Sequence, residues 1–219
     1  FAEVEADWVT PISGDCKGME LVEHPPNGQG ATAILLAKIL ARFDLPALDP
    51  FGAVRAHLEA EATKLAYDAR DRFLADAGHT KRLAHMTDDA TADALAALID
   101  PKRAMPTPPP AAGAVHKETV TLSVVDKDRM VVSMIYSIFH DFGSGIATPN
   151  FGLLFHNRGA GFCLEPGHPN EIGGGKRPMH TIIPGMLRDA GRVSMPFGVM
   201  GGADQATGHA RFLTNTVDY

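Results

Sequence analysis

A proline-rich segment divides this chain into two stretches of different character. The segment runs from Met105 to Ala114 and includes consecutive prolines at positions 108 to 110. Proline has no amide hydrogen and a fixed φ, so such a run can neither continue a helix nor lie inside a sheet. We expect an exposed tether here, with mostly helical structure before it and mostly strands after it.

The first strand after the tether is predicted to begin at Thr119. Apolar residues at positions 120, 122 and 124 alternate with hydroxyl residues at 119, 121 and 123. This period of two places the apolar side chains on one face of a sheet and the small hydroxyls on the other. On spacing alone, the ordinary interpretation is that Thr119 is one more β-branched residue in a strand.

The position of Thr119 also permits a chemical role. If the peptide bond between Glu118 and Thr119 is cut, Thr119 gains an α-amine with a reference pKa of about 7.7 to 8.0. A neutral amine can take the proton of the neighbouring hydroxyl, which is the threonine variant of an activated nucleophile. The sequence therefore offers a nucleophile made by chain cleavage, provided that other features support it.

Several separate motifs supply that support. They are Pro-Pro-Asn-Gly-Gln-Gly at 25–30, Glu-Ala-Thr-Lys-Leu-Ala-Tyr at 61–67, Ser-Val-Val-Asp-Lys-Asp at 123–128, Asp-Phe-Gly-Ser-Gly-Ile at 141–146, Gly-Lys-Arg-Pro-Met-His-Thr-Ile-Ile-Pro at 175–184 and Gly-Val-Met-Gly-Gly at 198–202. In this order, the motifs resemble those of the γ-glutamyltransferase family of N-terminal-nucleophile hydrolases over essentially the whole chain. Within the family, the pattern is closest to the branch of oxamate amidohydrolase and cephalosporin-acylase-like proteins.

The resemblance implies an α+β fold, the four-layer αββα sandwich of these hydrolases. Residues 1–118 would form the C-terminal part of a large subunit and residues 119–219 the N-terminal part of a small one, with cleavage between Glu118 and Thr119. The two processed subunits would remain together as a heterodimer. We expect the sequence to be a fragment that begins inside the large subunit and ends in a helix of the small subunit.

The resemblance also implies roles for four catalytic residues. Thr119 would be the nucleophile, and Ser137 would lie beside it and orient its amine. Gly201 and Gly202 would form the oxyanion hole, because glycine amides between a strand and a helix can approach an oxyanion closely and the helix N-terminus adds a positive dipole. The simpler alternatives are a core serine and an ordinary tight turn.

The acyl pocket departs from the transpeptidases at two places. His180 and Thr181 stand where those enzymes have two serines that touch the substrate, and Phe139 stands where they have an asparagine that binds the α-carboxylate. An aromatic ring cannot donate to a carboxylate, so we expect an acyl group other than unmodified γ-glutamyl. Arg158 and Arg177 are the candidates for binding a substrate carboxylate, and surface or structural ion pairs are the alternative.

Composition excludes several other functions. The net charge of -6 and pI of about 5.9 argue against a nucleic-acid partner, so we expect a small-molecule amide substrate. No cofactor and no metal are predicted, because the histidines match no ligand spacing, and there is no Gly-x-Ser-x-Gly elbow. Residues 26–30 lack the Lys-Ser/Thr ending of a phosphate loop. Cys16 and Cys163 fit no disulfide framework.

No apolar run reaches the roughly 18 residues that a membrane helix needs, so no membrane span is predicted. No signal peptide pattern is present, and the compartment stays open between cytoplasmic and periplasmic or secreted.

The predicted function is a self-processing amide hydrolase that acts through an acyl-enzyme on glutathione, a γ-glutamyl compound or a related amide. Transfer of the acyl group to an acceptor other than water is left open. The alternative is a catalytically silent family member that acts as a structural or interaction domain.

Periodicity and breaker residues give the expected elements. Helices are predicted over 31–43, 52–75, 90–99 and 205–219. Strands are predicted over 119–125, 131–138, 153–155, 181–187 and 193–199. Residues 1–29 are rich in glycine and proline and are predicted to have little regular structure.

Overall fold

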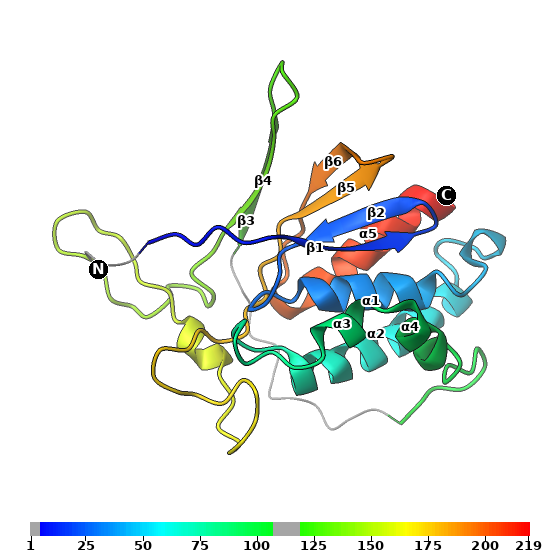
Figure 1. Ribbon diagram of the computed structural model, residues 1–219, viewed down its shortest axis with the longest axis horizontal. Coiled ribbons are helices and arrows are strands. Elements are labelled where there is room, and N and C mark those ends of the chain that lie inside the picture. Colours follow the sequence, from blue (N-terminus) through cyan, green and yellow to red (C-terminus); the bar gives the residue numbers. More distant parts are fainter. Residues whose placement is uncertain (1–4, 107–118) are drawn as a thin grey trace.

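The computed structural model describes residues 5–106 and 119–219 and has an α+β architecture (Figure 1). An antiparallel sheet of order β1-β2-β5-β6 forms one layer. Helices α1 (Gly30–Leu40) and α5 (Gln205–Asp218) pack beside each other under this sheet, and α2 (Ala53–Phe73), α3 (Leu83–Thr87) and α4 (Asp89–Ala96) lie beneath α1. Of the tether predicted over 105–114, residues 107–114 lie outside the described residues, as does Glu118.

The prediction that residues 1–29 lack regular structure is wrong. Strands β1 (Ile12–Cys16) and β2 (Met19–Glu23) form an antiparallel hairpin there. Lys17 and Gly18 connect them with φ values of 58° and 84°. Two successive residues with positive φ make the tight turn whose twist matches a hairpin, and a Lys-Gly pair is a weaker signal for it than Asn-Gly.

Helix α1 is the centre of the core. All of its residues from Gly30 to Leu40 are buried, because the sheet covers one side and the other helices cover the rest. Gly30 allows its first turn to lie against the preceding chain, since a Cβ there would come within 2.3 Å of the His24 carbonyl oxygen. The glycines of the 25–30 motif therefore permit close packing of the backbone.

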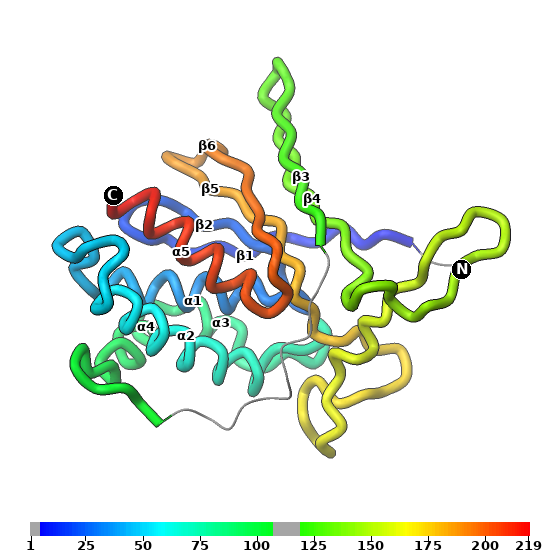
Figure 2. Tube along the Cα trace, turned by 180° about the vertical axis from the view of Figure 1, so that it is seen from behind, coloured from blue at the N-terminus to red at the C-terminus, as the bar shows by residue number. Residues whose placement is uncertain are grey.

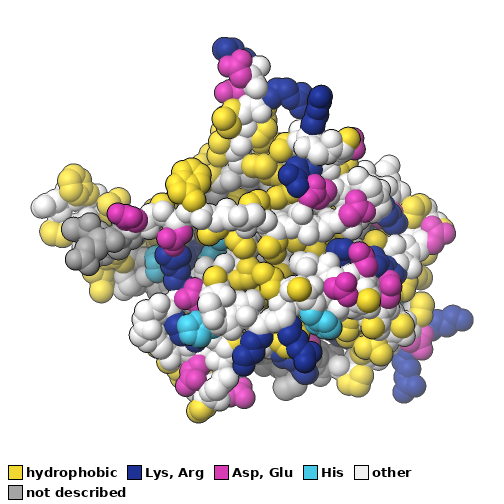
Figure 3. All heavy atoms as spheres, viewed as in Figure 1, with side chains coloured by type: hydrophobic (Ala, Val, Ile, Leu, Met, Phe, Trp, Pro, Cys, Tyr) yellow, Lys and Arg dark blue, Asp and Glu magenta, His cyan; other side chains and the backbone are white. Residues whose placement is uncertain are grey.

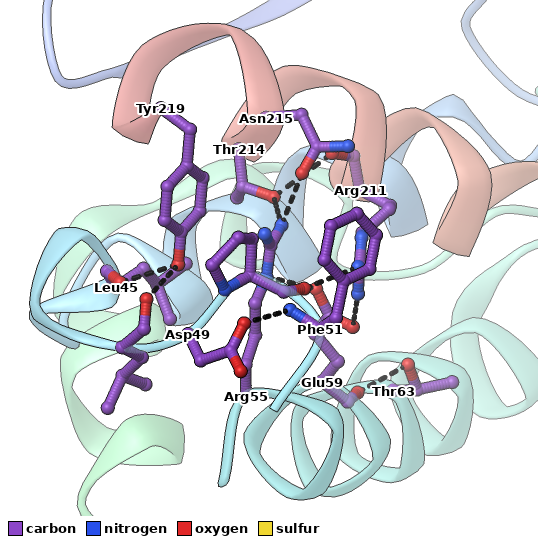
Figure 4. Close-up of polar contacts among 12 residues, drawn as sticks. Leu45, Asp49, Phe51, Arg55, Glu59, Thr63, Arg211, Thr214, Asn215 and Tyr219 are labelled. Atoms are coloured by element: carbon purple, nitrogen blue, oxygen red, sulfur yellow. Dashed lines mark hydrogen bonds and ion pairs between the residues drawn. The ribbon is translucent and has the colours of Figure 1, made fainter. Parts of the chain in front are cut away.

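Helices α2 and α5 are joined by polar contacts centred on Arg55, whose side chain is fully buried (Figure 4). Its guanidinium donates to Glu59 Oε1 at 2.9 Å, Thr214 Oγ1 at 3.0 Å and Asn215 Oδ1 at 2.7 Å. It also lies 4.7 Å from the centroid of the Tyr219 ring. A helix from before the proline-rich segment is thereby held to one from after it.

The strands β3 (Val120–Val125) and β4 (Val131–Tyr136) confirm the predicted hairpin and form a sheet of their own. The hairpin projects from the rest of the molecule (Figures 1 and 2). Apolar side chains on it are exposed, including Val124 at 56% and Met134 at 47% (Figure 3). Its inner end meets β6, where a Cβ on Gly198 would come within 2.3 Å of Thr121 Oγ1.

Most of the other predicted elements are confirmed with shifted ends. The helix predicted over 90–99 is confirmed as α4, and Asp88 caps it by accepting from the Thr91 amide at 3.2 Å. Strands β5 (Gly185–Asp189) and β6 (Arg192–Phe197) begin or end a few residues away from prediction. The strand expected at 153–155 is only an isolated bridge between Ala147 and Leu154. Within residues 5–106 and 119–219, no helix is long and apolar enough to cross a membrane.

Candidate active site

Thr119 and Ser137 meet at the inner end of the β3–β4 hairpin. Thr119 is buried, with 8% of its surface exposed, and its hydroxyl donates to Ser137 Oγ at 3.4 Å. This distance is long for a bond between hydroxyls. Val120 pairs with Tyr136 in the hairpin register, so the residues just outside that pair, Thr119 and Ser137, are brought together. The sheet pairing therefore creates the contact.

The residues after β4 turn back over Ser137. The Phe139 amide donates to Ser137 Oγ at 3.1 Å, and Phe139 has a φ of 82°. A positive φ is unusual for an aromatic residue, so the surrounding contacts must hold this turn in place. The Phe139 ring is buried and stacks on the His140 ring, with 4.1 Å between the centroids.

Arg158 places a buried cation beside this pair. It is 9% exposed, its Nη2 donates to the Ser137 carbonyl oxygen at 3.4 Å, and its guanidinium lies 5.4 Å from the Phe139 ring centroid. Among the residues that the structure describes, Arg158 Nη1 has no hydrogen-bond partner and no carboxylate pairs with the side chain. Burial lowers the pKa of this guanidinium. A buried cation without a partner costs free energy, and its planar fork fits a carboxylate.

His180 and Thr181 lie on the segment that precedes β5. The His180 amide donates to the Asn27 carbonyl oxygen at 2.9 Å. Burial, helped by the positive charge of Arg158 and by His24, lowers the pKa of His180 to about 3. The ring is therefore neutral near neutral pH and does not add a second positive charge. Thr181 is 6% exposed.

Gly201 and Gly202 form the turn between β6 and α5. Their φ values are 144° and 57°, in the region that favours glycine. A short 3-10 helix, η3 (Gly202–Asp204), follows and leads directly into α5. Amides at such a helix start carry partial positive charge, and without a Cβ they are open to an approaching oxyanion.

A model of the family described as gamma-glutamyltranspeptidase matches residues 1–219. The chain belongs to the gamma-glutamyltranspeptidase family. The glutathione hydrolase-like YwrD proenzyme of Bacillus subtilis is 30% identical over 100% of this chain and 41% of its own length. The oxamate amidohydrolase proenzyme of Klebsiella pneumoniae is 35% identical over 88% of this chain and 36% of its own length.

A solved structure agrees with this fold. The crystal structure of cephalosporin acylase from Bacillus halodurans matches with a TM-score of 0.88 and 34% identity, over 99% of this chain and 39% of that chain. The chain thus spans about two fifths of the length of the relatives that it matches. The mixed helix and sheet architecture predicted from sequence is confirmed by this match.

The structure brings some of the predicted site residues into contact with one another. Thr119, Ser137, Phe139 and Arg158 form one cluster. Thr181 and Gly202 are connected through a shared side chain. The catalytic and substrate-binding roles of all these residues stay predictions.

Arg177, the second predicted carboxylate ligand, lies elsewhere. Its guanidinium is exposed and pairs with Asp7 Oδ2 at 2.6 Å, which is the surface ion pair given as the alternative. The absence of a metal site stays a prediction, and within the described parts of the chain no group of three His, Cys, Asp or Glu side chains could hold an ion. Cys16 and Cys163 are both free.

The side chain that sequence analysis missed is Gln29. Its Nε2 donates to the carbonyl oxygens of Thr181 at 2.8 Å and Gly202 at 3.1 Å. The signal was present in the 25–30 motif, where a buried helix follows a glutamine between two glycines. That motif contributes to the family resemblance and does not match a phosphate loop, and neither interpretation gives its glutamine a role.

Proposed function

We propose that the chain is part of a self-processing amide hydrolase in which Thr119 is the nucleophile. The observation that carries this proposal is the buried Thr119 hydroxyl, 3.4 Å from Ser137 Oγ and directly behind the predicted tether. Catalytic hydrogen bonds are often long before substrate binds, so this distance is compatible with the role. The relatives named as proenzymes of a glutathione hydrolase type and of oxamate amidohydrolase support the same class of reaction.

The reaction proceeds in two halves. Thr119 Oγ bonds to the amide carbonyl carbon while its proton passes to the α-amine of Thr119. Gly201 and Gly202 hold the oxyanion, the C–N bond breaks, and the amine returns the proton to the leaving nitrogen. Water then attacks the ester, gives its proton to the same amine, and releases the acid and the Thr119 hydroxyl. Ser137 orients the amine throughout.

Maturation uses the same hydroxyl. Thr119 Oγ bonds to the Glu118 carbonyl carbon, the C–N bond breaks, and the hydroxyl proton passes to the nitrogen that becomes the α-amine of Thr119. Water then hydrolyses the resulting ester, which releases the carboxylate of residue 118 and restores the Thr119 hydroxyl. Residues 1–118 then belong to a large subunit and residues 119–219 to a small one. The contacts of Arg55 with Thr214 and Asn215 cross this boundary and would hold the two subunits together (Figure 4).

The first expected result is that the complete protein runs as two chains in denaturing electrophoresis. N-terminal sequencing of the smaller chain should begin at Thr119. The two chains should elute together under native conditions, because many contacts join residues before the cleaved bond to residues after it. A single intact chain with no amidase activity would instead support the catalytically silent alternative.

We also propose that the acyl part of the substrate carries a carboxylate that binds Arg158. Arg158 Nη1 is buried beside the Thr119–Ser137 contact and has no hydrogen-bond partner in the described parts of the chain, so a bidentate carboxylate would satisfy it. Oxamate, in the name of the Klebsiella relative, is a mono-amide of a dicarboxylic acid and belongs to this chemical class. We therefore expect mono-amides of short dicarboxylic acids that lack an α-ammonium group to be better substrates than γ-glutamyl amides, whose α-ammonium would lie close to the same buried cation.

The second expected result concerns Phe139→Asn. Asparagine tolerates positive φ better than other residues, so the backbone at 82° can persist while the side chain gains an amide donor. The ratio of hydrolysis of glutathione to that of mono-amides should rise, measured as kcat/KM for each. Phe139→Leu is the matched control, because it removes the ring without adding a donor. An unchanged ratio in Phe139→Asn would show that Phe139 does not line the acyl pocket.

We propose that the complete protein forms a four-layer αββα sandwich. The exposed apolar side chains of the β3–β4 hairpin, such as Val120 and Tyr136, need to be covered by further sheet and helix structure. The relatives have more than half of their length outside the matched region, which is enough chain to supply those layers.

A further inference from the structure

The Gln29 side chain connects the backbone of Thr181 with that of Gly202, two residues predicted to belong to the active site. Gln29 precedes α1 and is completely buried. Its Nε2 donates one hydrogen bond to the Thr181 carbonyl oxygen at 2.8 Å and another to the Gly202 carbonyl oxygen at 3.1 Å. One amide group therefore sets the separation of the segment before β5 from the turn before α5.

Arg70 fixes the orientation of that amide. Its Nη1 donates to Gln29 Oε1 at 3.2 Å, and a guanidinium can only donate hydrogen bonds. The oxygen of the amide must therefore face Arg70, and both N–H groups must face the two carbonyls. Arg70 is itself held, because its Nε donates to Asp71 Oδ1 at 2.8 Å and its guanidinium lies 4.2 Å from the Tyr67 ring centroid.

Tyr67 holds the next residue of the same turn. Its hydroxyl donates to the Ala203 carbonyl oxygen at 2.6 Å and contacts Thr207 Oγ1 at 2.9 Å. Burial raises the pKa of Tyr67, so this hydroxyl keeps its proton near neutral pH. The carbonyls of Gly202 and Ala203 are thus both bonded to side chains from before the proline-rich segment.

The hydrogen bonds from Gln29 and Tyr67 hold a turn whose two glycines constrain the backbone little by themselves. Two successive glycines can adopt many conformations, and Gly202 adopts a φ of 57° that other residues avoid. A donor aimed at an oxyanion stabilises it only if the donor is already in place when charge develops. Holding the Gly202 carbonyl limits rotation of the peptide units on either side of it.

We propose that Gln29 is a positioning residue for hydrolysis: it orders the Gly201–Gly202 turn against the 180–181 segment so that the oxyanion donors are pre-arranged. This inference rests on the proposed function, in which Thr119 attacks and these glycines receive the oxyanion. It goes beyond that function because a side chain that takes no part in the chemistry would control the rate of hydrolysis. That side chain comes from the part of the chain before the cleavage site. Gln29 acts through the turn and does not touch the substrate.

The test compares Gln29→Met with Gln205→Met in the complete protein. Gln205 is also fully buried and its Oε1 accepts one hydrogen bond, from the Ile183 amide at 3.2 Å. Both variants lose a buried amide, but only the first loses the bond to Gly202. The first measurement is the rate of self-cleavage after cell-free synthesis, which requires no added substrate. The second is kcat and KM for the best mono-amide, normalised to the processed small chain.

Gln29→Met should slow self-cleavage and lower kcat by about tenfold to a hundredfold, the loss expected when reacting groups are displaced by about 1 Å. KM should change little, because ground-state binding does not depend on the oxyanion donors. Binding of boronopropanoic acid should weaken by a similar factor. Its boron bonds to Thr119 Oγ, the proton passes to the α-amine, and the tetrahedral adduct places an oxygen where the oxyanion forms. Binding of succinate, which forms no adduct, should be unchanged.

Tyr67→Phe is a milder second variant that removes the hydroxyl bonded to the Ala203 carbonyl oxygen and to Thr207 Oγ1 and leaves Gln29 in place. It should lower kcat several-fold with KM unchanged. If Gln29→Met folds poorly, this variant still tests the bracing of the turn. Equal losses in Gln29→Met and Gln205→Met, or a loss confined to KM, would overturn the inference. Failure of the proposed function is distinguishable, because Thr119→Ala would then remain active or be cut.

Discussion

Replacing Thr119 with alanine is expected to leave the complete protein as one uncut chain without amidase activity. Both maturation and turnover need the same hydroxyl, so losing it removes both together. Loss of the nucleophile lowers kcat on the order of ten-thousandfold or more in enzymes that act through an acyl intermediate. Electrophoresis over several days and hydrolysis of a panel of mono-amides measure the two effects separately.

Thr119→Ser is the matched control, because it keeps the hydroxyl and, after cleavage, the neighbouring amine. It should still be cut, and it should keep measurable hydrolysis. Cleavage of the Thr119→Ala variant at the bond after Glu118 would mean that another group or another protein performs the processing. Hydrolysis by that uncut variant at the rate of the native enzyme would remove Thr119 from the mechanism altogether.

The parts of the fold that were predicted correctly are those that depend on short-range chemistry. Asp88 starts α4 because its carboxylate accepts from an amide three residues later, and that signal lies within a few residues. The β3–β4 hairpin follows from alternation around the turn at Asp126–Arg129. By contrast, β1 and β2 were missed because glycine and proline were taken as loop signals. The Lys-Gly turn is decided by the pairing of Leu21 with Leu187 in the larger sheet.

The candidate site divides in the same way. The register of one hairpin joins Thr119 to Ser137, so sequence could place these two residues together. Gln29 could not be assigned from spacing, because its partners lie far along the chain, and the sequence offered Arg158 only as one of two candidate carboxylate ligands. Gln29 bonds to Gly202 across 173 positions. Arg158 and Arg177 look alike in the sequence, and only the structure separates the buried guanidinium, which has no carboxylate partner among residues 5–106 and 119–219, from the surface ion pair.

That difference between two arginines gives the second large expected effect. Arg158→Met should lower kcat/KM for mono-amides of dicarboxylic acids by about a hundredfold or more. The estimate follows from the roughly 2 to 5 kcal/mol lost when one partner of a buried charge pair is removed. Butanamide, which has a methyl group in place of the carboxylate of succinamate, should change little. The selectivity for the charged substrate should therefore collapse, measured as the ratio of the two kcat/KM values.

Arg177→Met is the matched control, because it removes a guanidinium whose partner Asp7 is an exposed carboxylate. It should leave the ratio unchanged. Arg158→Lys keeps the charge but loses the planar fork, so it should recover part of the selectivity. Equal losses on succinamate and butanamide in Arg158→Met would show that the residue supports the site structurally and does not bind the carboxylate.

Thermal unfolding separates these interpretations independently of activity. A buried arginine with a structural role forms an ion pair with a carboxylate of the protein. Removing the arginine leaves that carboxylate buried without its partner, which lowers the stability of the protein. Arg158 instead has a buried Nη1 without a partner among the described residues, and burial already lowers the pKa of its guanidinium. Replacing it with methionine should leave the Tm of the complete protein unchanged or raise it, while a carboxylate ligand should raise the Tm of the native protein only. A clear fall in Tm for Arg158→Met would point to a carboxylate partner supplied by the protein itself, and the pocket would then have no free cation for the substrate.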